Sequence, residues 1–322
     1  MVGGGVRPHM KQSGFIAGRG LFTGREASIA FGPGDGLAFV VAGRQIAAHV
    51  QQVVPANGPL GGRSTNIQHA SASALTVEHA MSALAGLNIW DASVTLRAVD
   101  DAGAESIEVP ILDGSALDFV RAIDAAGLVC ASTDAEADES SSKPRIDRAE
   151  RGKAEPTPPP RPSPHHGRGS TRLVRPIRVE DPKTGAFIEA RPSESLRYRY
   201  ELSYPPGSGI GDQAAEWDGG ADEYRREIAP ARTFCLEREA QAMKAAGLFT
   251  HLTPRDMLVI APEGHPIDNE LRFNNEPARH KLLDLIGDLA LLGGRLIADV
   301  RAVRSGHALT HELCRRVMME VG

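Results

Sequence analysis

The sequence contains few cysteines, few aromatic residues (5%) and no long uninterrupted hydrophobic run. Its three cysteines, Cys130, Cys235 and Cys314, are scattered and odd in number, which argues against a disulfide framework and against a cysteine metal site. The first residues also lack the apolar core of a signal peptide. Together these absences predict a cytoplasmic protein.

The lack of a hydrophobic run and of excess positive charge excludes two classes of protein. The most apolar stretch, residues 282–300, is interrupted by Asp284, Asp288 and Arg295, which a bilayer-spanning helix would not normally carry. We therefore expect at most a peripheral contact with a membrane. The formal net charge of -5 argues against nucleic-acid binding, which relies on a strongly basic face.

The composition divides the chain into two domains and a linker. Residues 131–170 are acidic and Ser-rich, then basic and Pro-rich, and they offer almost no apolar side chains to bury. Such a segment cannot offset the entropy cost of ordering, so we expect a disordered linker whose His165-His166 pair is solvated. The predicted domains are then residues 1–130 and residues 171–322.

The two predicted domains resemble each other in the order of their elements. A helix over residues 76–87 is followed by a strand over 92–99, and a helix over 279–292 is followed by a strand over 296–303. Both strands end in Arg-Ala-Val, both helices carry a histidine near their start, and each strand leads through a polar turn to another helix. This pattern predicts a duplicated unit.

Short alternating segments precede the helices of each domain. They are residues 26–31, 37–41, 172–179, 187–191 and 196–204. Strand runs followed by helices favour an α+β fold, in which helices cover one face of a mostly antiparallel sheet.

The helix near residue 280 carries the first candidate metal site. At about 100° per residue, His280, Asp284 and Asp288 lie on one face, and leucines occupy the other. An imidazole and a carboxylate one turn apart are a ligand pair that suits zinc. Alone, this spacing is typical of a solvated helix face. The apolar character of the rest of the helix favours a buried helix instead.

Two further motifs carry chemistry. Glu78-His79 stands at the start of a helix for which Thr76 is the expected N-cap, so one residue could hold a metal ion while its neighbour takes a proton from water. Ser305-Gly306-His307 follows a strand and precedes a helix, and a histidine there could reach a site at the strand end. Alone, the first motif is typical of an exposed pair that complements the helix dipole, and the second of a surface turn.

Taken together, these motifs resemble those of the UDP-3-O-acyl-N-acetylglucosamine deacetylases, zinc enzymes of the committed step of lipid A synthesis. The matching segments cover most of both predicted domains in the right order. They are Gly20-Leu21-Phe22-Thr23-Gly24, Leu75-Thr76-Val77-Glu78-His79, Leu84-Ala85-Gly86-Leu87, Pro110-Ile111-Leu112-Asp113-Gly114-Ser115, Ala231-Arg232-Thr233-Phe234, Leu271-Arg272-Phe273, Arg279-His280-Lys281-Leu282-Leu283-Asp284, Ile286-Gly287-Asp288 and Ser305-Gly306-His307-Ala308.

The resemblance implies a fold and a metal site. The fold would be two similar two-layer α/β sandwich domains of the ribosomal protein S5 domain 2-like type, with the active site between them. His79, His280 and Asp284 would be the ligands of a Zn2+ ion, which leaves a fourth position for water. The substrate would be an acylated UDP-glucosamine, and the protein is expected to be a monomer.

The resemblance also implies roles for the other motif residues. Glu78 would be the general base, and His307, oriented by Asp288, would stabilise the oxyanion or protonate the departing amine. Thr233 would donate a hydroxyl hydrogen bond to the tetrahedral intermediate. Lys281, Phe234 and Leu21 would bind the substrate, and the Asp113-Gly114-Ser115 turn would cap the following helix.

Some positions depart from the family pattern. Phe22 stands where a histidine is usual, and residues 249–254 lack the usual glycine-rich turn. In the family this region forms the passage for the acyl chain. A related zinc deacetylase acting on a different N-acetyl sugar is therefore the first alternative. A non-catalytic binding module is the second, although the base and all three ligands are present.

Overall fold

The computed structural model describes residues 8–55, 62–101, 103–130 and 169–321. All but the last two residues of the expected 131–170 linker, including its His165-His166 pair, therefore lie outside the described residues. The described chain resumes at Gly169, and Ser170 already belongs to strand β12 (Ser170–Arg172).

The first half is built on a five-stranded sheet. Its strand order is β2-β3-β9-β4-β5, and all neighbours are antiparallel except the parallel pair β4 and β9. The strands are β2 (Ile16–Arg19), β3 (Glu26–Pro33), β4 (Leu37–Val41), β5 (Arg44–Ala47) and β9 (Ala92–Ala98), and the helices are α1 (Glu78–Gly86) and α2 (Leu117–Ala126).

The second half repeats this plan. Its sheet has the order β13-β14-β19-β15-β16, again antiparallel except for one parallel pair, β15 and β19. The strands are β13 (Ile177–Glu180), β14 (Phe187–Pro192), β15 (Arg197–Ser203), β16 (Asp212–Trp217) and β19 (Arg295–Val303), and the main helices are α5 (Glu276–Leu289) and α6 (His307–Val321). Strand β12 pairs with β19 outside this order. The duplication predicted from the sequence is confirmed by the shared strand order.

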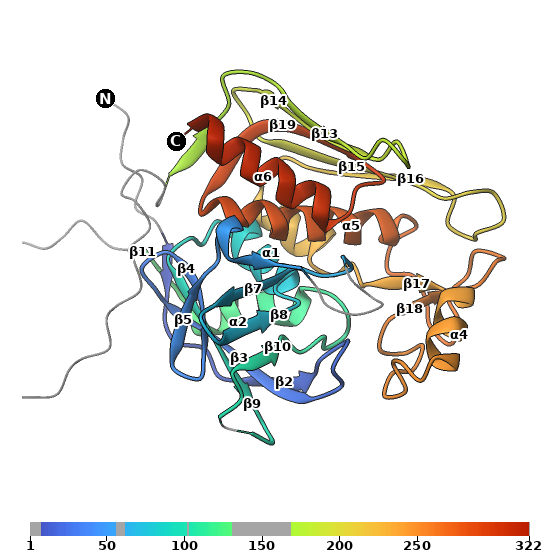
Figure 1. The fold of residues 1–322 in the computed structure, drawn as a ribbon, viewed down its shortest axis with the longest axis horizontal. Coiled ribbons are helices and arrows are strands. Elements are labelled where there is room, and N and C mark those ends of the chain that lie inside the picture. Colours follow the sequence, from blue (N-terminus) through green and yellow to red (C-terminus); the bar gives the residue numbers. More distant parts are fainter. Residues whose placement is uncertain (1–7, 56–61, 102, 131–168, 322) are drawn as a thin grey trace, which may run out of the picture.

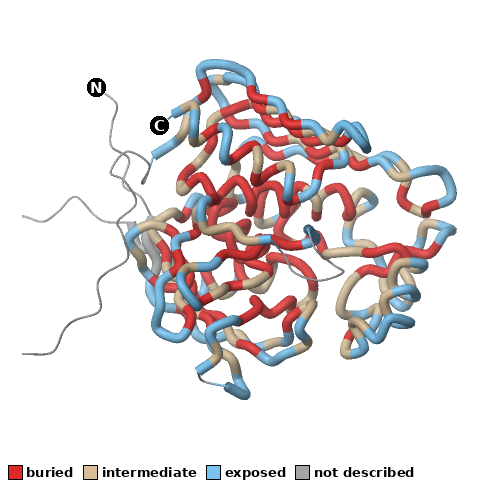
Figure 2. Tube along the Cα trace, in the orientation of Figure 1, coloured by how far each residue is buried: buried red, intermediate tan, exposed pale blue. Residues whose placement is uncertain are grey.

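The helices lie between the two sheets. In Figure 1 the second-half sheet lies above α5 and α6, and α1, α2 and the first-half sheet lie below them. Figure 2 shows that burial is concentrated in this central helical region, while the outer loops are exposed. Strand β9 alternates buried and more exposed residues, as expected for a sheet with one face on the core.

Each half carries its own insertion. In the first half a small sheet of order β10-β8-β7-β6 is formed by β6 (Val53–Val54), β7 (Asn66–His69), β8 (Ala72–Leu75) and β10 (Ser106–Glu108). In the second half the parallel strands β17 (Phe234–Leu236) and β18 (Leu258–Ile260) flank helix α4 (Glu237–Ala245), a unit at the right of Figure 1.

The remaining elements are short. They are β1 (Pro8–Met10) paired with β11 (Leu128–Cys130), the 3-10 helices η1 (Val50–Gln52) and η3 (Ala290–Leu292), helix α3 (Ala221–Glu223) and the π-helical turn η2 (Tyr224–Ile228). None of the helices in the described ranges combines the length and the hydropathy that a bilayer crossing requires.

Three local expectations were wrong. Thr76 is not an N-cap, because α1 begins at Glu78 after Val77, and the Thr76 hydroxyl donates to Glu108 instead. Residues 172–179 are not one strand, because the stretch between β12 and β13 contains Pro176, which has no N–H to donate to a ladder. His307 does not precede its helix but is the first residue of α6, so a rigid element carries it.

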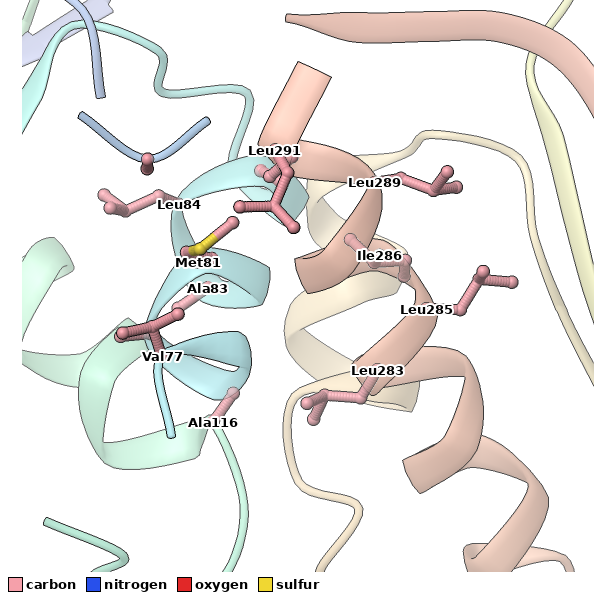
Figure 3. Packing of buried hydrophobic residues seen from close by; sticks show 14 of the residues in the cluster. Val77, Met81, Ala83, Leu84, Ala116, Leu283, Leu285, Ile286, Leu289 and Leu291 are labelled. Atoms are coloured by element: carbon pink, nitrogen blue, oxygen red, sulfur yellow. The ribbon is translucent and has the colours of Figure 1, made fainter. Parts of the chain in front are cut away.

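Helices α1 and α5 approach closely because a glycine lies at their contact. A Cβ atom on Gly287 of α5 would collide with the carbonyl oxygen of Glu78 at the start of α1. Around this point Met81 and Leu84 of α1 are fully buried, and Figure 3 shows Leu283 of α5 pointing toward the side of α1. In the same view Leu285 and Leu289 point away from α1, so α5 buries apolar side chains on two sides.

We predict that Gly287→Ala forces α1 and α5 apart. The backbone must shift to relieve the collision, which costs about 1–3 kcal/mol as overpacking does. Thermal unfolding and zinc affinity should both report the change. Gly14→Ala is the control, because a Cβ there meets no atom within 4 Å. Equal stability and zinc affinity in both variants would contradict this account of the helix contact.

Candidate metal centre and active site

Three side chains from the two halves meet at the contact between α1 and α5. His79 comes from the first turn of α1, and His280 and Asp284 are one turn apart on α5. The Asp284 Oδ1 atom lies 3.4 Å from His79 Nε2 and 3.5 Å from His280 Nε2. All three residues are buried, and their candidate ligand atoms lie within 4.8 Å of one another. The structure thus brings together the three ligands named from the sequence.

The hydrogen bonds of this cluster leave Asp284 Oδ1 and His280 Nε2 available to bind a metal ion. Asp284 Oδ1 is buried without a hydrogen-bond partner, whereas Oδ2 accepts from Lys281 Nζ at 2.6 Å. His280 Nδ1 lies 3.2 Å from the carbonyl oxygen of Ala231. An Nδ1–H donated to that oxygen leaves the Nε2 lone pair directed at Asp284, which is the usual arrangement of a metal-binding histidine. One carboxylate and two imidazoles fit a zinc ion.

The electrostatics of the cluster favour the protonation states that bind a metal ion. Burial lowers the pKa of His280 to about 3, so this imidazole is neutral. Burial alone would raise the pKa of Asp284, but the Lys281 ammonium and the surrounding histidines together outweigh it and hold that pKa well below its ordinary value. A neutral imidazole and an ionised carboxylate are the forms that bind metal.

Glu78 is held beside the metal cluster by the first half. Its Oε2 accepts a hydrogen bond of 3.0 Å from the backbone N–H of Thr65. Burial raises the pKa of Glu78 above its ordinary value, although His307 and His79 act in the opposite direction. A carboxyl group with a raised pKa is suited to accept a proton near neutral pH.

The backbone before Glu78 is held in a strained conformation. Thr76 has a φ of 56°, which is unfavourable for a β-branched residue. Two hydrogen bonds hold it there: its N–H donates to Asn66 Oδ1 at 2.9 Å, and its hydroxyl donates to Glu108 Oε1 at 3.1 Å. These contacts direct the chain into α1 with Glu78 and His79 facing α5.

His307 and Asp288 form a buried pair on the other side of the cluster. His307 Nδ1 lies 2.8 Å from Asp288 Oδ2, and His307 Nε2 lies 4.0 Å from Asp284 Oδ2. Burial would lower the pKa of His307, but the Asp288 carboxylate, together with Glu78 and Asp284, outweighs it and raises that pKa to about 9. His307 is therefore a protonated imidazolium near neutral pH, with Nε2 toward the metal cluster.

One cavity of about 520 Å³ collects most of the residues named from the sequence. Those that line it are Leu21, Glu78, His79, Thr233, Phe234, His280, Lys281, Asp284 and His307. Asp288 lies behind His307 and not on the cavity wall. The ring of Phe234 packs edge-on against His280 at 6.3 Å, and Lys281 reaches Asp284 from the cavity side.

The two halves also meet at the far wall of this cavity. Phe22, from the loop between β2 and β3, contacts Phe249, which follows α4, with ring centroids 5.7 Å apart. Both rings line the cavity, as do Leu252 and Val259. The loop is fixed because Glu108 accepts the backbone N–H groups of Phe22 and Thr23 at 2.9 and 2.8 Å. The positions that depart from the family pattern therefore face the same space as the metal cluster.

Several site residues were not found from the sequence. Thr65 and His311 lie behind His307, where Thr65 Oγ1 contacts Asp288 Oδ1 at 2.5 Å and His311 Nε2 at 2.9 Å. Neither residue belongs to a motif, and for Thr65 the sequence offers no local signal. His311 is at least one turn after His307 on α6, a spacing that would have placed both on one helix face.

The sequence also did not predict the buried ion pair between Arg232 and Glu276. Arg232 Nε donates to Glu276 Oε1 at 2.8 Å, and both side chains are almost fully buried. Glu276 begins α5, and Arg232 follows Ala231, whose carbonyl orients His280. The Arg232–Glu276 pair thus holds the Ala231 carbonyl close to the start of α5, the helix that carries His280. Arg232 stood within a motif, but only its tertiary contact reveals the role.

Comparison with known proteins agrees with this geometry. A family model described as LpxC, UDP-3-O-acyl N-acetylglycosamine deacetylase, matches residues 8–158 and 163–319. The chain is 32% identical over 302 residues to the UDP-3-O-acyl-N-acetylglucosamine deacetylase of Chlamydia pneumoniae, which covers 93% of this chain and 92% of that protein. It is 30% identical over 318 residues to the enzyme of the same name from Chlamydia felis, covering 97% and 96%.

A bacterium outside the genus Chlamydia provides a third relative. The UDP-3-O-acyl-N-acetylglucosamine deacetylase of Acidithiobacillus ferrooxidans is 32% identical over 259 residues, which are 80% of this chain and 70% of that protein. The family match runs through both halves and includes the segments that carry the buried His-His-Asp cluster. The chain belongs to the UDP-3-O-acyl-N-acetylglucosamine deacetylase family of zinc-dependent hydrolases.

Proposed function

We propose that this protein removes the N-acetyl group of a UDP-3-O-acyl-N-acetylglucosamine by zinc-dependent hydrolysis, the committed step of lipid A synthesis. The observation that carries the proposal is the buried His79–His280–Asp284 cluster, flanked by a carboxyl group with a raised pKa and an imidazolium in one cavity.

His79, His280 and Asp284 would hold the zinc ion. When bound, zinc supplies Lewis acidity toward a carbonyl oxygen and toward water. Glu78 takes the proton of the attacking water, since its carboxyl group lies beside the ligands and its raised pKa suits that transfer. The Thr65 N–H occupies one lone pair of Oε2 and thereby fixes the orientation of the carboxyl plane.

His307 supplies the acid group of the proposed reaction. Its charge stabilises the developing oxyanion or provides the proton for the departing amine, and Asp288 fixes the Nδ1–H so that Nε2 faces the reaction. Thr233, on the cavity wall beside these groups, donates its hydroxyl hydrogen to the same oxyanion.

The remaining wall residues bind the substrate. Lys281 provides a cation whose side chain is partly exposed in the cavity wall, and its bond to Asp284 Oδ2 also orients that ligand. Phe234 and Leu21 provide apolar surface for the sugar and its substituents. The wall formed by Phe22, Phe249 and the segment after α4 is apolar enough for an acyl chain.

The fold type, the domain bounds, the location and the oligomeric state are also part of the proposal. We infer that each half is a two-layer α/β sandwich of the ribosomal protein S5 domain 2-like type, and the shared strand order supports this. The domains would be residues 1–130 and 171–322, joined by the 131–170 linker. A cytoplasmic location, a monomeric state and at most peripheral membrane contact stay predictions, as does the absence of nucleic-acid binding.

The metal assignment predicts which histidine substitution releases zinc. His280→Ala removes a ligand and leaves Asp284 Oδ1 buried with one imidazole, so we expect the zinc content after dialysis against a chelator to fall close to zero. His69→Ala, in β7 and outside the cavity, should keep the zinc of the wild type. Equal zinc content in the two variants would refute the assignment.

The base assignment predicts a loss of turnover without loss of metal. Glu78→Ala should keep zinc bound and lower kcat by roughly two or more orders of magnitude, the usual worth of a general base. His307→Ala should likewise lower kcat while retaining zinc. An unchanged rate in Glu78→Ala would overturn its role, and zinc loss in His307→Ala would mean that this residue is a ligand.

The substrate assignment is tested by comparing two nucleotide sugars. After chelation and zinc add-back, the protein should deacetylate UDP-3-O-acyl-N-acetylglucosamine with a kcat/KM at least about 100-fold above that for UDP-N-acetylglucosamine, because the acyl chain contributes binding energy along the apolar wall. The Phe22–Phe249 contact at that wall motivates the alternative of a different N-acetyl sugar. Equal rates on the two compounds would favour that alternative.

A further inference from the structure

Thr65 contacts the catalytic base through its backbone. It lies in the first half immediately before β7 and is fully buried. Its N–H donates to Glu78 Oε2 at 3.0 Å, and its carbonyl accepts the N–H of Val77, the residue before α1, at 3.0 Å. The same residue thus fixes both the carboxyl group of Glu78 and the start of the helix that carries it.

The side chain of Thr65 contacts the second half. Its Oγ1 atom lies 2.5 Å from Asp288 Oδ1, 2.9 Å from His311 Nε2 and 3.3 Å from His307 Nδ1. The three partners come from α5 and α6 and are buried. One threonine of the first half is therefore enclosed by the acid pair of the second half and by a histidine that the mechanism has not used.

The donors and acceptors around Thr65 define one hydrogen-bond chain. A threonine hydroxyl has a single proton, and an ionised carboxylate only accepts, so the hydroxyl donates to Asp288 Oδ1. Its lone pair is then free to accept the Nε2–H of His311. Asp288 Oδ2 accepts the Nδ1–H of His307 at 2.8 Å. Both oxygens of Asp288 are thereby held, and the carboxyl group cannot rotate away from His307.

We propose that Thr65 is a positioning residue that aligns the base with the acid pair across the two halves, and that His311 fixes the direction in which its hydroxyl donates. The inference rests on the proposed roles of Glu78 and His307. Its physical basis is that one residue holds Glu78 through the backbone and Asp288 through the side chain. A relative displacement of the two halves would therefore disturb both proton-transfer groups together.

The distinguishing variant removes the hydroxyl and keeps the shape. Thr65→Val retains the backbone N–H to Glu78 but removes the hydroxyl donor to Asp288 Oδ1. In the zinc-loaded enzyme we expect kcat to fall roughly 10- to 100-fold, as for other partners that orient catalytic ligands, with zinc content and KM close to those of the wild type. Thr65→Ser keeps the hydroxyl and should restore most of the turnover.

A matched control is available on α6. Thr310 is also buried, and its side chain has no part in the cavity wall or the Asp288 contacts, so Thr310→Val should leave kcat unchanged. His311→Gln, which can still donate an N–H to Thr65, should keep more turnover than His311→Phe, which cannot. Equal turnover in these two His311 variants would contradict the role given to His311.

A double-mutant cycle separates positioning from simple packing. If Thr65 acts through Asp288, Thr65→Val should cost much less turnover in an Asp288→Asn background than in the wild type. If the two substitutions act independently, their fold-losses of kcat multiply, so their free-energy costs add. Full additivity of the two substitutions, or wild-type kcat in Thr65→Val, would overturn the inference.

A measurement that needs no turnover tests the positioning role of Thr65 independently of the proposed deacetylase activity. The Nδ1–H of His307 should give a low-field proton resonance that is lost in His307→Ala. We expect this resonance to shift in Thr65→Val and not in Thr310→Val. If the resonance shifts while the wild type does not deacetylate the acylated sugar, the proposed function fails and the positioning stands. If the resonance and kcat are both unchanged in Thr65→Val, the positioning is refuted.

Discussion

The close contact between α1 and α5 is the constraint on which the site depends. Because Gly287 lets α5 lie against the carbonyl of Glu78, a histidine from the first half comes within 3.4 Å of the carboxylate of Asp284 in the second. Neither half has a complete set of ligands alone. The apolar side chains around this contact, shown in Figure 3, stabilise the pairing of the halves and so also the metal cluster.

Burial at this contact would be costly if the charges were not compensated. Asp288 is satisfied by His307 and Thr65, Asp284 Oδ2 by Lys281, and Glu276 by Arg232. Among the described residues, three buried side-chain atoms lack a hydrogen-bond partner: Gln213 Oε1, Glu223 Oε2 and Asp284 Oδ1. Of these, Asp284 Oδ1 lies between two imidazole nitrogens, where a metal ion would satisfy it.

The repeated sheets and helices hold the catalytic groups, whereas the insertions form the wall that faces the substrate. The two sheets and four main helices repeat the same order and hold the ligands, base and acid on rigid elements. The insertions differ between the halves, and each shapes the cavity wall. The first does so through Glu108, which fixes the loop of Phe22, and the second through Phe249 and the strands beside α4. Changes in this wall can alter the substrate while leaving the metal cluster intact.

The sequence by itself determined the duplication, the main helices and the ligand set. Helical spacing places His280 and Asp284 on one face. The local motifs at His79, Glu78 and His307 carry the family resemblance, and that resemblance implies the ligand set. Only the tertiary structure decided that Thr65, which is separated from Asp288 by 223 residues and from His311 by 246, lies between base and acid. It also decided that Thr76 does not cap α1 and that Arg232 pairs with Glu276. Such contacts depend on how the two halves pack, and no periodicity or local propensity encodes which distant side chains will meet.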